Sequence, residues 1–200
     1  MSEAMTNGTD AESRPTALVV IDMQRAMLGS EPDDQPAPHR ADEMLANTAA
    51  MLERARSAGA SVLFVRHVED AYPPMRPGHP GFEIHDAIAP LPGEPVVDKR
   101  ACDAFCGTPL ADLLAERGVT HLVTCGLQTE MCVDSTSRSA VHRGLNVTLA
   151  ADAHSAWDAR SGLTADQIIA HHNMTLAGIP HPTATITVTP SAEIDFATST

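Results

Sequence analysis

The sequence predicts a three-layer α/β/α domain, in which helices cover both faces of a doubly wound, mainly parallel sheet of five to six strands. Three observations point to this fold class. Apolar runs of strand length alternate along the chain with amphipathic stretches of helical period. Parallel neighbours cannot be joined by hairpins, so the alternation implies right-handed crossovers through helices. A chain of 200 residues also has the size of one such domain.

The first predicted element of the domain is a buried strand over residues 17–21. Residues 1–15 are mostly polar, show no apolar period and are expected to form a flexible tail. The remaining residues, 16–200, are expected to form a single domain. The run at 17–21 is apolar throughout, which is typical of a strand buried on both faces, and it ends at Asp22.

The later elements follow the same alternation. Stretches with apolar residues three to four positions apart predict helices over residues 41–57, 108–117, 131–142 and 164–177. Short apolar or extended runs predict strands over residues 61–65, 95–99, 119–125, 146–151 and 184–188. Thr164 is expected to cap the last helix. Residues 68–94 hold six prolines and three glycines, and so long a loop is usually functional.

The charge balance excludes several classes of partner. The chain has 13 Lys and Arg against 26 Asp and Glu, a net charge of −13, which would repel nucleic acid and anionic membranes. No run approaches the roughly 20 apolar residues of a membrane helix. The first ten residues are polar and acidic, unlike a signal peptide. A cytoplasmic protein with a small-molecule substrate is therefore expected.

The four cysteines lack the paired spacing of a disulfide scaffold or a structural zinc site. Cys125 lies on an apolar strand and is predicted to belong to the core. Cys102 and Cys106 are four residues apart, which favours a buried helical pair. Cys132 falls where the turn after the third buried strand enters a helix, and this position requires a separate explanation.

Asp22, Lys99 and Cys132 are the residues that together suggest chemistry. Separately they have ordinary interpretations: a turn residue, a solvated charge and a small core side chain. In a doubly wound sheet, however, ligands bind beyond the carboxyl ends of the strands, where these residues are expected. A helix N-terminus and a nearby ammonium favour a thiolate, and a carboxylate can accept the thiol proton.

Several segments carry a resemblance to a known family. They read Val-Val-Ile-Asp-Met-Gln at 19–24, Val-Asp-Lys-Arg at 97–100, Ala-Phe-Cys-Gly-Thr at 104–108, Gly-Leu-Gln-Thr-Glu-Met-Cys-Val at 126–133 and the strand at 147–152. In order and spacing the chain resembles the isochorismatase-like cysteine hydrolases, which include nicotinamidases and carbamoylsarcosine amidases. The resemblance spans roughly residues 16 to 190 and implies their Rossmann-like fold.

The resemblance implies a catalytic triad of Asp22, Lys99 and Cys132. It also implies a cis peptide between Leu127 and Gln128, with the backbone N–H groups of Gln128 and Cys132 as an oxyanion hole. The implied reaction is hydrolysis of a C–N bond in a small amide, lactam or ureido compound through an acyl-enzyme on Cys132. Segments 128–136, 152–157 and 170–173 resemble a branch that includes streptothricin hydrolase, which opens an amide ring in an antibiotic.

A metal or other cofactor is not expected. Nicotinamidases carry an Asp-x-His motif and further histidines beyond the second strand, whereas the corresponding residues here read Arg-His-Val-Glu-Asp at 66–70. The pattern is missing, although His67, His79 and His85 remain in the region and can still meet in space.

Six residues are predicted to contact the substrate: His67, Tyr72, Phe105, Gln128, Glu130 and Trp157. His67 lies at a strand end, Phe105 belongs to a matching segment, and Gln128 and Glu130 flank the nucleophile. For Glu130 the alternative is a helix cap, and for Trp157 it is packing in the core or an interface. His154 is predicted to have a structural role.

Two other functions remain open at this stage. Family members that cleave the vinyl ether of isochorismate can dispense with the cysteine, and Asp22 would then act as the acid. A non-catalytic member of the fold is the third possibility. The presence of Cys132 favours amide chemistry. The resemblance also implies a homo-oligomer, either a dimer or a tetramer.

Overall fold

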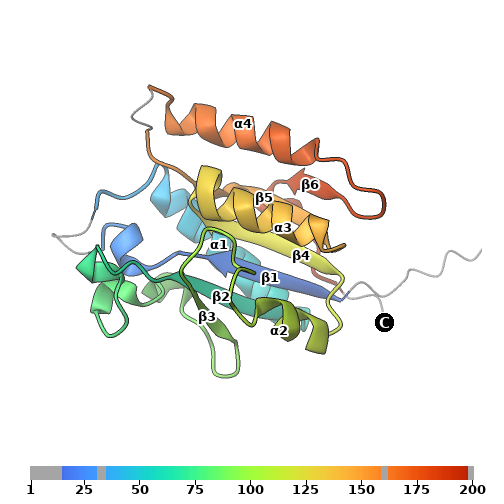
Figure 1. The fold of residues 1–200 in the computed structure, drawn as a ribbon, viewed down its shortest axis with the longest axis horizontal. Coiled ribbons are helices and arrows are strands. Elements are labelled where there is room, and N and C mark those ends of the chain that lie inside the picture. Colours follow the sequence, from blue (N-terminus) through green and yellow to red (C-terminus); the bar gives the residue numbers. More distant parts are fainter. Residues whose placement is uncertain (1–14, 31–34, 159–161, 198–200) are drawn as a thin grey trace, which may run out of the picture.

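The computed structural model of the protein describes residues 15–30, 35–158 and 162–197. Six parallel strands form one sheet in the order β3-β2-β1-β4-β5-β6. Their bounds are Thr16–Ile21 (β1), Ser61–His67 (β2), Val96–Lys99 (β3), His121–Leu127 (β4), Asn146–Ser155 (β5) and Ile186–Thr189 (β6). The strand order reverses between β1 and β4, which confirms the predicted doubly wound sheet (Figure 1).

Helices cover both faces of the sheet. They are Ala41–Ser57 (α1), Leu110–Glu116 (α2), Asp134–His142 (α3) and Ala165–Ala177 (α4). In Figure 1, α1 lies behind the sheet, α2 and α3 lie in front of it, and α4 runs beside β6. Single helical turns occupy residues 25–27, 73–75, 80–82, 86–88 and 191–193, and a π-helical turn spans Thr129–Val133. Thr164 caps α4 as expected, through a reciprocal pair of hydrogen bonds with Gln167.

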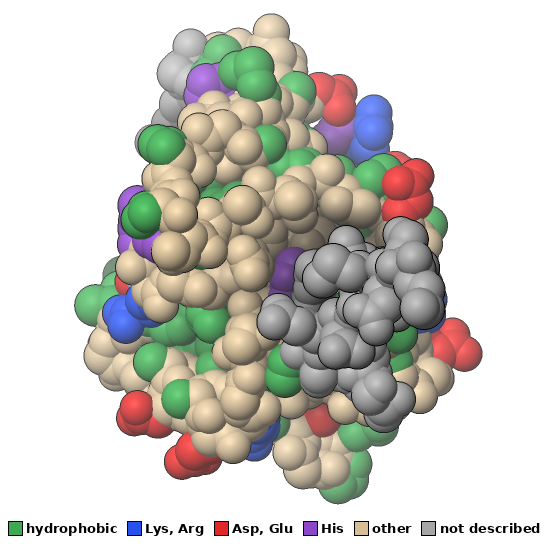
Figure 2. Space-filling model, turned by 90° about the vertical axis from the view of Figure 1, so that its right-hand side faces the viewer, with side chains coloured by type: hydrophobic (Ala, Val, Ile, Leu, Met, Phe, Trp, Pro, Cys, Tyr) green, Lys and Arg blue, Asp and Glu red, His purple; other side chains and the backbone are tan. Residues whose placement is uncertain are grey.

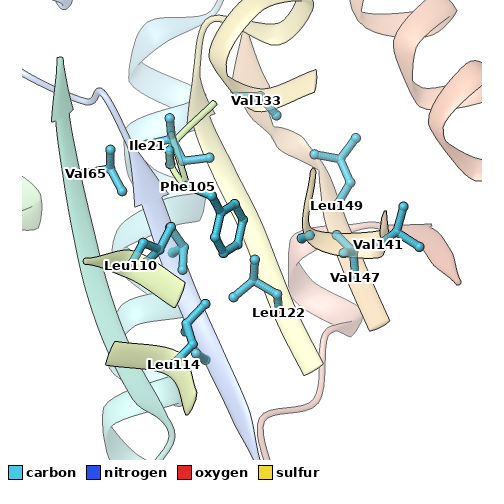
Figure 3. Packing of buried hydrophobic residues seen from close by; sticks show 14 of the residues in the cluster. Ile21, Val65, Phe105, Leu110, Leu114, Leu122, Val133, Val141, Val147 and Leu149 are labelled. Carbon is cyan, nitrogen blue, oxygen red and sulfur yellow. The ribbon is translucent and has the colours of Figure 1, made fainter. Parts of the chain in front are cut away.

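Two apolar clusters, one on each face, explain why β1 is apolar throughout. Leu18 and Val20 pack against α1, while Val19 and Ile21 pack against the side covered by α2 and α3. Figure 3 shows the second cluster, in which the ring of Phe105 lies among aliphatic side chains. Each fully buried aliphatic side chain contributes about 1.5–3 kcal/mol, so these layers hold the strand ends in place.

The predicted and observed elements differ most around β5. The prediction ended this strand before Asp152, but it continues to Ser155 through an irregularity in its pairing with β4. Thr124 pairs with Leu149, whereas Gly126 pairs with His154. Asp152 is exposed in this irregular stretch, and His154 is buried beside the end of β4.

The prediction of a helical pair at Cys102 and Cys106 was wrong. Residues 100–109 form a series of turns that includes Gly107 at φ +67°, and α2 begins only at Leu110. Cys106 is exposed and Cys102 is half-buried. Cys125 is buried in the core, as predicted.

Residues outside the described ranges include most of the expected N-terminal tail, residues 1–14. Within those ranges, no helix has both the length and the apolar character needed to cross a membrane. Figure 2 views the side on which β1 begins. On that face, Lys and Arg side chains of the described residues lie apart from one another and form no gathered basic patch.

Candidate active site

Four neighbouring strands deliver the predicted catalytic side chains to one edge of the sheet. Asp22 follows β1, Lys99 ends β3, and Cys132 lies in the π-helical turn after β4. His67 ends β2 and is paired with Lys99 across the β2–β3 ladder. Since β3, β2, β1 and β4 are adjacent and parallel, their carboxyl ends meet.

The Lys99 ammonium is shared by three partners. Its Nζ atom lies 2.7 Å from Asp22 Oδ2, 3.0 Å from Cys132 Sγ and 3.2 Å from His67 Nδ1. An ammonium has three N–H donors and no acceptor, so the imidazole accepts through Nδ1 and all three donors are used. Lys99 is only 1% exposed. Asp22, Lys99 and Cys132 are far apart in the sequence, but in the structure Lys99 contacts both of the others.

Asp22 is held in an unusual backbone conformation. Its φ is +52°, in the left-handed region that non-glycine residues rarely adopt. Its N–H donates to the Val65 carbonyl at 2.9 Å, which continues the contact between β1 and β2. Its Oδ1 atom is buried and has no hydrogen-bond partner among the described residues. One carboxylate oxygen thus binds the ammonium, and the other remains available.

Burial and charge set the protonation states of the site. Burial disfavours the charged form of Lys99, but its interactions with the Asp22 carboxylate and the Cys132 sulfur outweigh burial and raise the Lys99 pKa. Burial, helped by Lys99, lowers the His67 pKa, which favours the neutral imidazole. Burial and the Asp22 carboxylate raise the pKa of the Cys132 thiol, although Lys99 opposes them. Cys132 is only 8% exposed, so burial opposes the thiolate that the helix N-terminus and the ammonium were expected to favour.

The turn that carries Cys132 begins with a cis peptide bond between Leu127 and Gln128. The Gln128 carbonyl accepts the N–H groups of Met131 at 3.0 Å and of Val133 at 3.2 Å, which closes the turn. Cys132 thus lies in a short π-helical turn immediately before α3.

A chain of buried hydrogen bonds ties this turn to β5 and α4. Thr129 Oγ1 is 2.8 Å from His154 Nδ1, and His154 Nε2 is 2.8 Å from Asn173 Oδ1. Asn173 in turn donates to the Ala151 carbonyl at 3.2 Å. Burial lowers the pKa of His154 to about 4, so the ring is neutral and bridges a donor and an acceptor. His154 thus has the structural role that was predicted. Its partners are one side chain of the turn that carries Cys132 and one side chain of α4.

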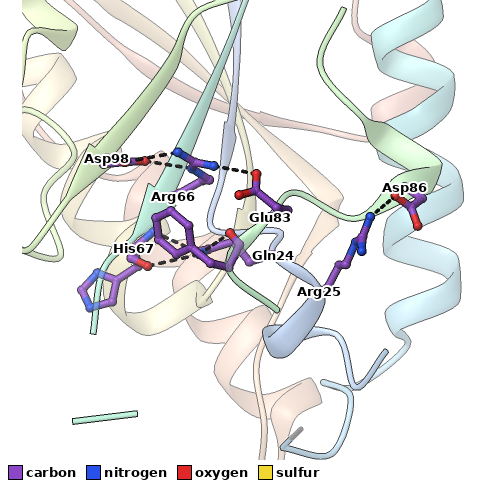
Figure 4. A network of polar contacts seen from close by, with 8 residues as sticks. Gln24, Arg25, Arg66, His67, Glu83, Asp86 and Asp98 are labelled. Carbon is purple, nitrogen blue, oxygen red and sulfur yellow. Dashed lines mark hydrogen bonds and ion pairs between the residues drawn. The ribbon is translucent and has the colours of Figure 1, made fainter. Parts of the chain in front are cut away.

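Sequence reasoning missed the role of Gln24. Its side-chain amide accepts the His67 N–H at 2.8 Å and donates to the His67 carbonyl at 3.1 Å and to the Phe82 carbonyl at 2.9 Å (Figure 4). Gln24 is fully buried, two residues after Asp22. The available signal was the position of Gln24 at the end of the matching segment 19–24, two residues after Asp22.

Gln128 and Glu130 contact each other in the turn that carries Cys132. Gln128 Nε2 donates to Glu130 Oε1 at 2.5 Å, and Glu130 Oε2 is buried without a hydrogen-bond partner among the described residues. No side-chain hydrogen bond caps the N-terminus of the π-helical turn or of α3, so the alternative of Glu130 as a helix cap is not observed.

The three aromatic residues predicted to contact substrate have other partners. Tyr72 Oη accepts the Gln35 N–H at 3.1 Å, and Trp157 Nε1 donates to the Pro36 carbonyl at 2.6 Å, so both hold the segment before α1. Phe105 is 5% exposed and lies in the core cluster of Figure 3. Their contact with substrate stays a prediction.

The histidines considered for a metal site do not assemble. Among the described residues, the one group of three potential ligands consists of Asp22, His67 and Cys132, whose ligand atoms all lie within 4.8 Å of one another. His79 and His85 belong to no such group. Each accepts, through Nδ1, the backbone N–H two residues further on.

The chain is similar to several known proteins. The model of the isochorismatase domain family matches residues 16–180. A streptothricin hydrolase of Streptomyces noursei is 42% identical over 159 residues, which cover 79% of this chain and 62% of that protein. A ureidoacrylate amidohydrolase of Variovorax paradoxus is 30% identical over 64% of this chain and 63% of its own length. The chain thus spans less than two thirds of the length of these curated relatives.

Solved structures show the same arrangement of elements. The crystal structure of a cysteine hydrolase from Pseudomonas syringae pv. phaseolicola superposes with a TM-score of 0.80 at 27% sequence identity, covering 90% of each chain. The likeness therefore extends over most of the chain.

Proposed function

Because the chain belongs to the isochorismatase family of hydrolases, we propose that it is a metal-independent cysteine hydrolase of a small amide, lactam or ureido compound. The observation that carries the proposal is the direct contact of the Lys99 ammonium with both Asp22 and Cys132 in a buried site. A carboxylate, a cation and a thiol at these distances are the parts that acyl transfer through a cysteine needs.

In the proposed acylation step, Asp22 acts as the general base. The free Oδ1 oxygen accepts the Cys132 thiol proton as the sulfur attacks the substrate carbonyl, while Lys99 stabilises both anions. The backbone N–H groups of Gln128 and Cys132 then stabilise the tetrahedral oxyanion. Such donors typically contribute a few kcal/mol each. The raised thiol pKa fits a proton transfer that accompanies attack.

In the proposed steps that follow, the acyl-enzyme forms and is then hydrolysed. The C–N bond breaks as the proton held by Asp22 passes to the leaving nitrogen, and the amine departs. Water then attacks the thioester, with Asp22 again taking the proton, and the freed carboxylic acid leaves Cys132 as a thiol.

The relatives support an amide-type substrate. One is named for hydrolysis of streptothricin and another for amide hydrolysis of ureidoacrylate. We propose that His67, Gln128 and Glu130 face such a substrate, since His67 contacts Lys99 and the other two lie in the turn that carries Cys132. Tyr72, Phe105 and Trp157 are proposed as outer elements of the same pocket.

The central test is the Cys132→Ala variant. We expect it to lose at least about 10³-fold in kcat while it keeps the wild-type circular dichroism spectrum, because the acyl-enzyme cannot form. Release of ammonia or amine from a panel of primary amides, lactams and ureido compounds measures the activity. Cys106→Ala, which removes an exposed thiol, is the matched control and should keep full activity.

The same variants separate the alternatives. If Cys132→Ala cleaves isochorismate as fast as the wild type while Asp22→Asn does not, the reaction is vinyl ether hydrolysis with Asp22 as acid. A wild-type protein that binds compounds of the panel without turnover would identify a non-catalytic member of the fold.

A further inference from the structure

The Lys99 ammonium lies at the centre of three side chains that are common metal ligands. Nζ is 2.7 Å from Asp22 Oδ2, 3.0 Å from Cys132 Sγ and 3.2 Å from His67 Nδ1. The ligand atoms of these three residues lie within 4.8 Å of one another. A positive charge therefore already occupies the middle of a carboxylate, thiol and imidazole set.

We propose that Asp22, His67 and Cys132 form a latent Zn²⁺ site, whose centre Lys99 occupies in the native protein and which binds zinc once the ammonium is removed. Zinc prefers thiolate sulfur, imidazole nitrogen and carboxylate oxygen, and three such ligands leave a fourth position for water. Binding would release the Cys132 thiol proton to solvent, and the sulfur would coordinate the metal as a thiolate.

The geometry requires only small movements. Zinc bonds to these atoms are about 2.0–2.3 Å long, so the ligand atoms must approach the present Nζ position by about 0.5–1.2 Å. The His67 nitrogen that faces the centre is already an acceptor, because Lys99 donates to it.

The native protein excludes the metal for a steric and an electrostatic reason. The Lys99 side chain is fully buried, and its ammonium donates to all three prospective ligand atoms. An ammonium offers no lone pair to a metal. A metal ion at the centre of the site would also be repelled by the positive charge of Lys99. Lys99 thereby keeps the Cys132 sulfur uncoordinated and free to attack carbon.

The test is cobalt binding to Lys99→Ala, made in a Cys102→Ser, Cys106→Ser background that removes the more accessible thiols. We expect this protein to take up one Co²⁺ per chain, with the near-ultraviolet charge-transfer band of a cobalt thiolate, and Zn²⁺ to displace it. The same background with Lys99 intact should show no band at equal Co²⁺. The experiment measures metal binding and not turnover, so its result does not depend on the proposed reaction.

Ligand variants identify the site. Adding Cys132→Ser to the Lys99→Ala protein should abolish the band, and adding His67→Ala should weaken binding by about 10- to 100-fold or more. Exposed histidines give no thiolate band, so they do not mimic the result.

Thermal unfolding gives a second readout. Lys99→Ala leaves the buried Asp22 carboxylate without its cation, which lowers the Tm, and Zn²⁺ should raise it again because the ion binds only the folded state. The proposal is overturned by the absence of a cobalt band, by a band that survives Cys132→Ser, or by a variant that stays unfolded even when refolded with Zn²⁺.

Discussion

At the level of single residues, the ion pair of Asp22 and Lys99 controls the chemistry open to Cys132. Removing two charges from water costs several kcal/mol per ion, and this cost is offset only when the geometry is good and further hydrogen bonds are made. Lys99 satisfies that condition with three acceptors. In this arrangement the Cys132 thiol lies beside the ion pair, and burial opposes its ionisation.

The resting state of Cys132 can be tested by alkylation. With iodoacetamide at pH 7, we expect Cys106 to react before Cys132, because Cys106 is exposed while Cys132 is buried and its thiol pKa is raised. The Cys132 rate should then grow about tenfold per pH unit from pH 7 to 9, since the thiolate fraction does so well below the pKa. Peptide mass spectrometry measures both rates. Rapid, pH-independent labelling of Cys132 would instead indicate a standing thiolate.

At the level of elements, the close approach of β1 and β4 places the nucleophile turn next to Asp22. Gly126 pairs with Ile21 and has φ +115°. A Cβ atom at this position would lie 2.1 Å from the Ile21 carbonyl oxygen. Only glycine therefore allows the two strands to lie this close just before the turn.

The Gly126→Ala variant should lose about 4 kcal/mol or more of unfolding free energy, because the added methyl group meets backbone atoms that cannot move independently. Gly118→Ala is the matched control. It also has a positive φ, of +62°, but nothing within 4 Å of the added Cβ, so it should lose only about 1–2 kcal/mol. Urea unfolding measures both, and equal losses would contradict the steric explanation.

The hydrogen bonds of His154 connect three elements: the nucleophile turn, β5 and α4. Burial lowers its pKa to about 4, below the roughly 6.5 of an unfolded histidine. The unfolded chain therefore binds more protons between these values, and stability is lost as pH falls through that window. Integrated from pH 7 to pH 5, the loss from this group is about 2 kcal/mol.

His154→Gln should accordingly remove about 2 kcal/mol of the pH 7 to pH 5 decline in unfolding free energy, because glutamine does not titrate. His171→Gln, at an exposed position of α4, should leave the decline unchanged. Urea unfolding at the two pH values measures the difference. An identical decline in wild type and His154→Gln would show that His154 is not buried in neutral form.

The molecule as a unit is acidic, with a net charge of −13, and still exposes several large apolar side chains. Met131, beside the nucleophile, is 46% exposed, and Met174 on α4 is 70% exposed. Exposed apolar side chains of this size favour association when they gather in one patch.

We expect native mass spectrometry to give a dimer or a tetramer of the 21.1 kDa chain. A Met174→Lys variant should shift the distribution towards monomer if α4 contributes to the contact, because burying an unpaired ammonium there is unfavourable. A wild-type monomer at micromolar concentration would contradict the expected homo-oligomer.

The alternation of apolar runs and helical periods was enough to predict the parallel, doubly wound sheet. A strand buried on both faces is apolar at nearly every position, and this can be seen in the sequence. Asp22 and Lys99 were visible as charged residues at the ends of predicted strands, and Cys132 as a cysteine in the turn that follows another. The turns of residues 100–109 were not, because i, i+4 spacing of Cys102 and Cys106 occurs in helices and turns alike.

Which atoms touch was settled by strand register and turn geometry, which no spacing along the chain encodes. Pairing of His67 with Lys99 brings the imidazole to the ammonium, and the irregular stretch of β5 brings His154 to Thr129. Burial, a property of the packed molecule, then raised the thiol pKa of Cys132, where its helix-terminal position alone had suggested the opposite.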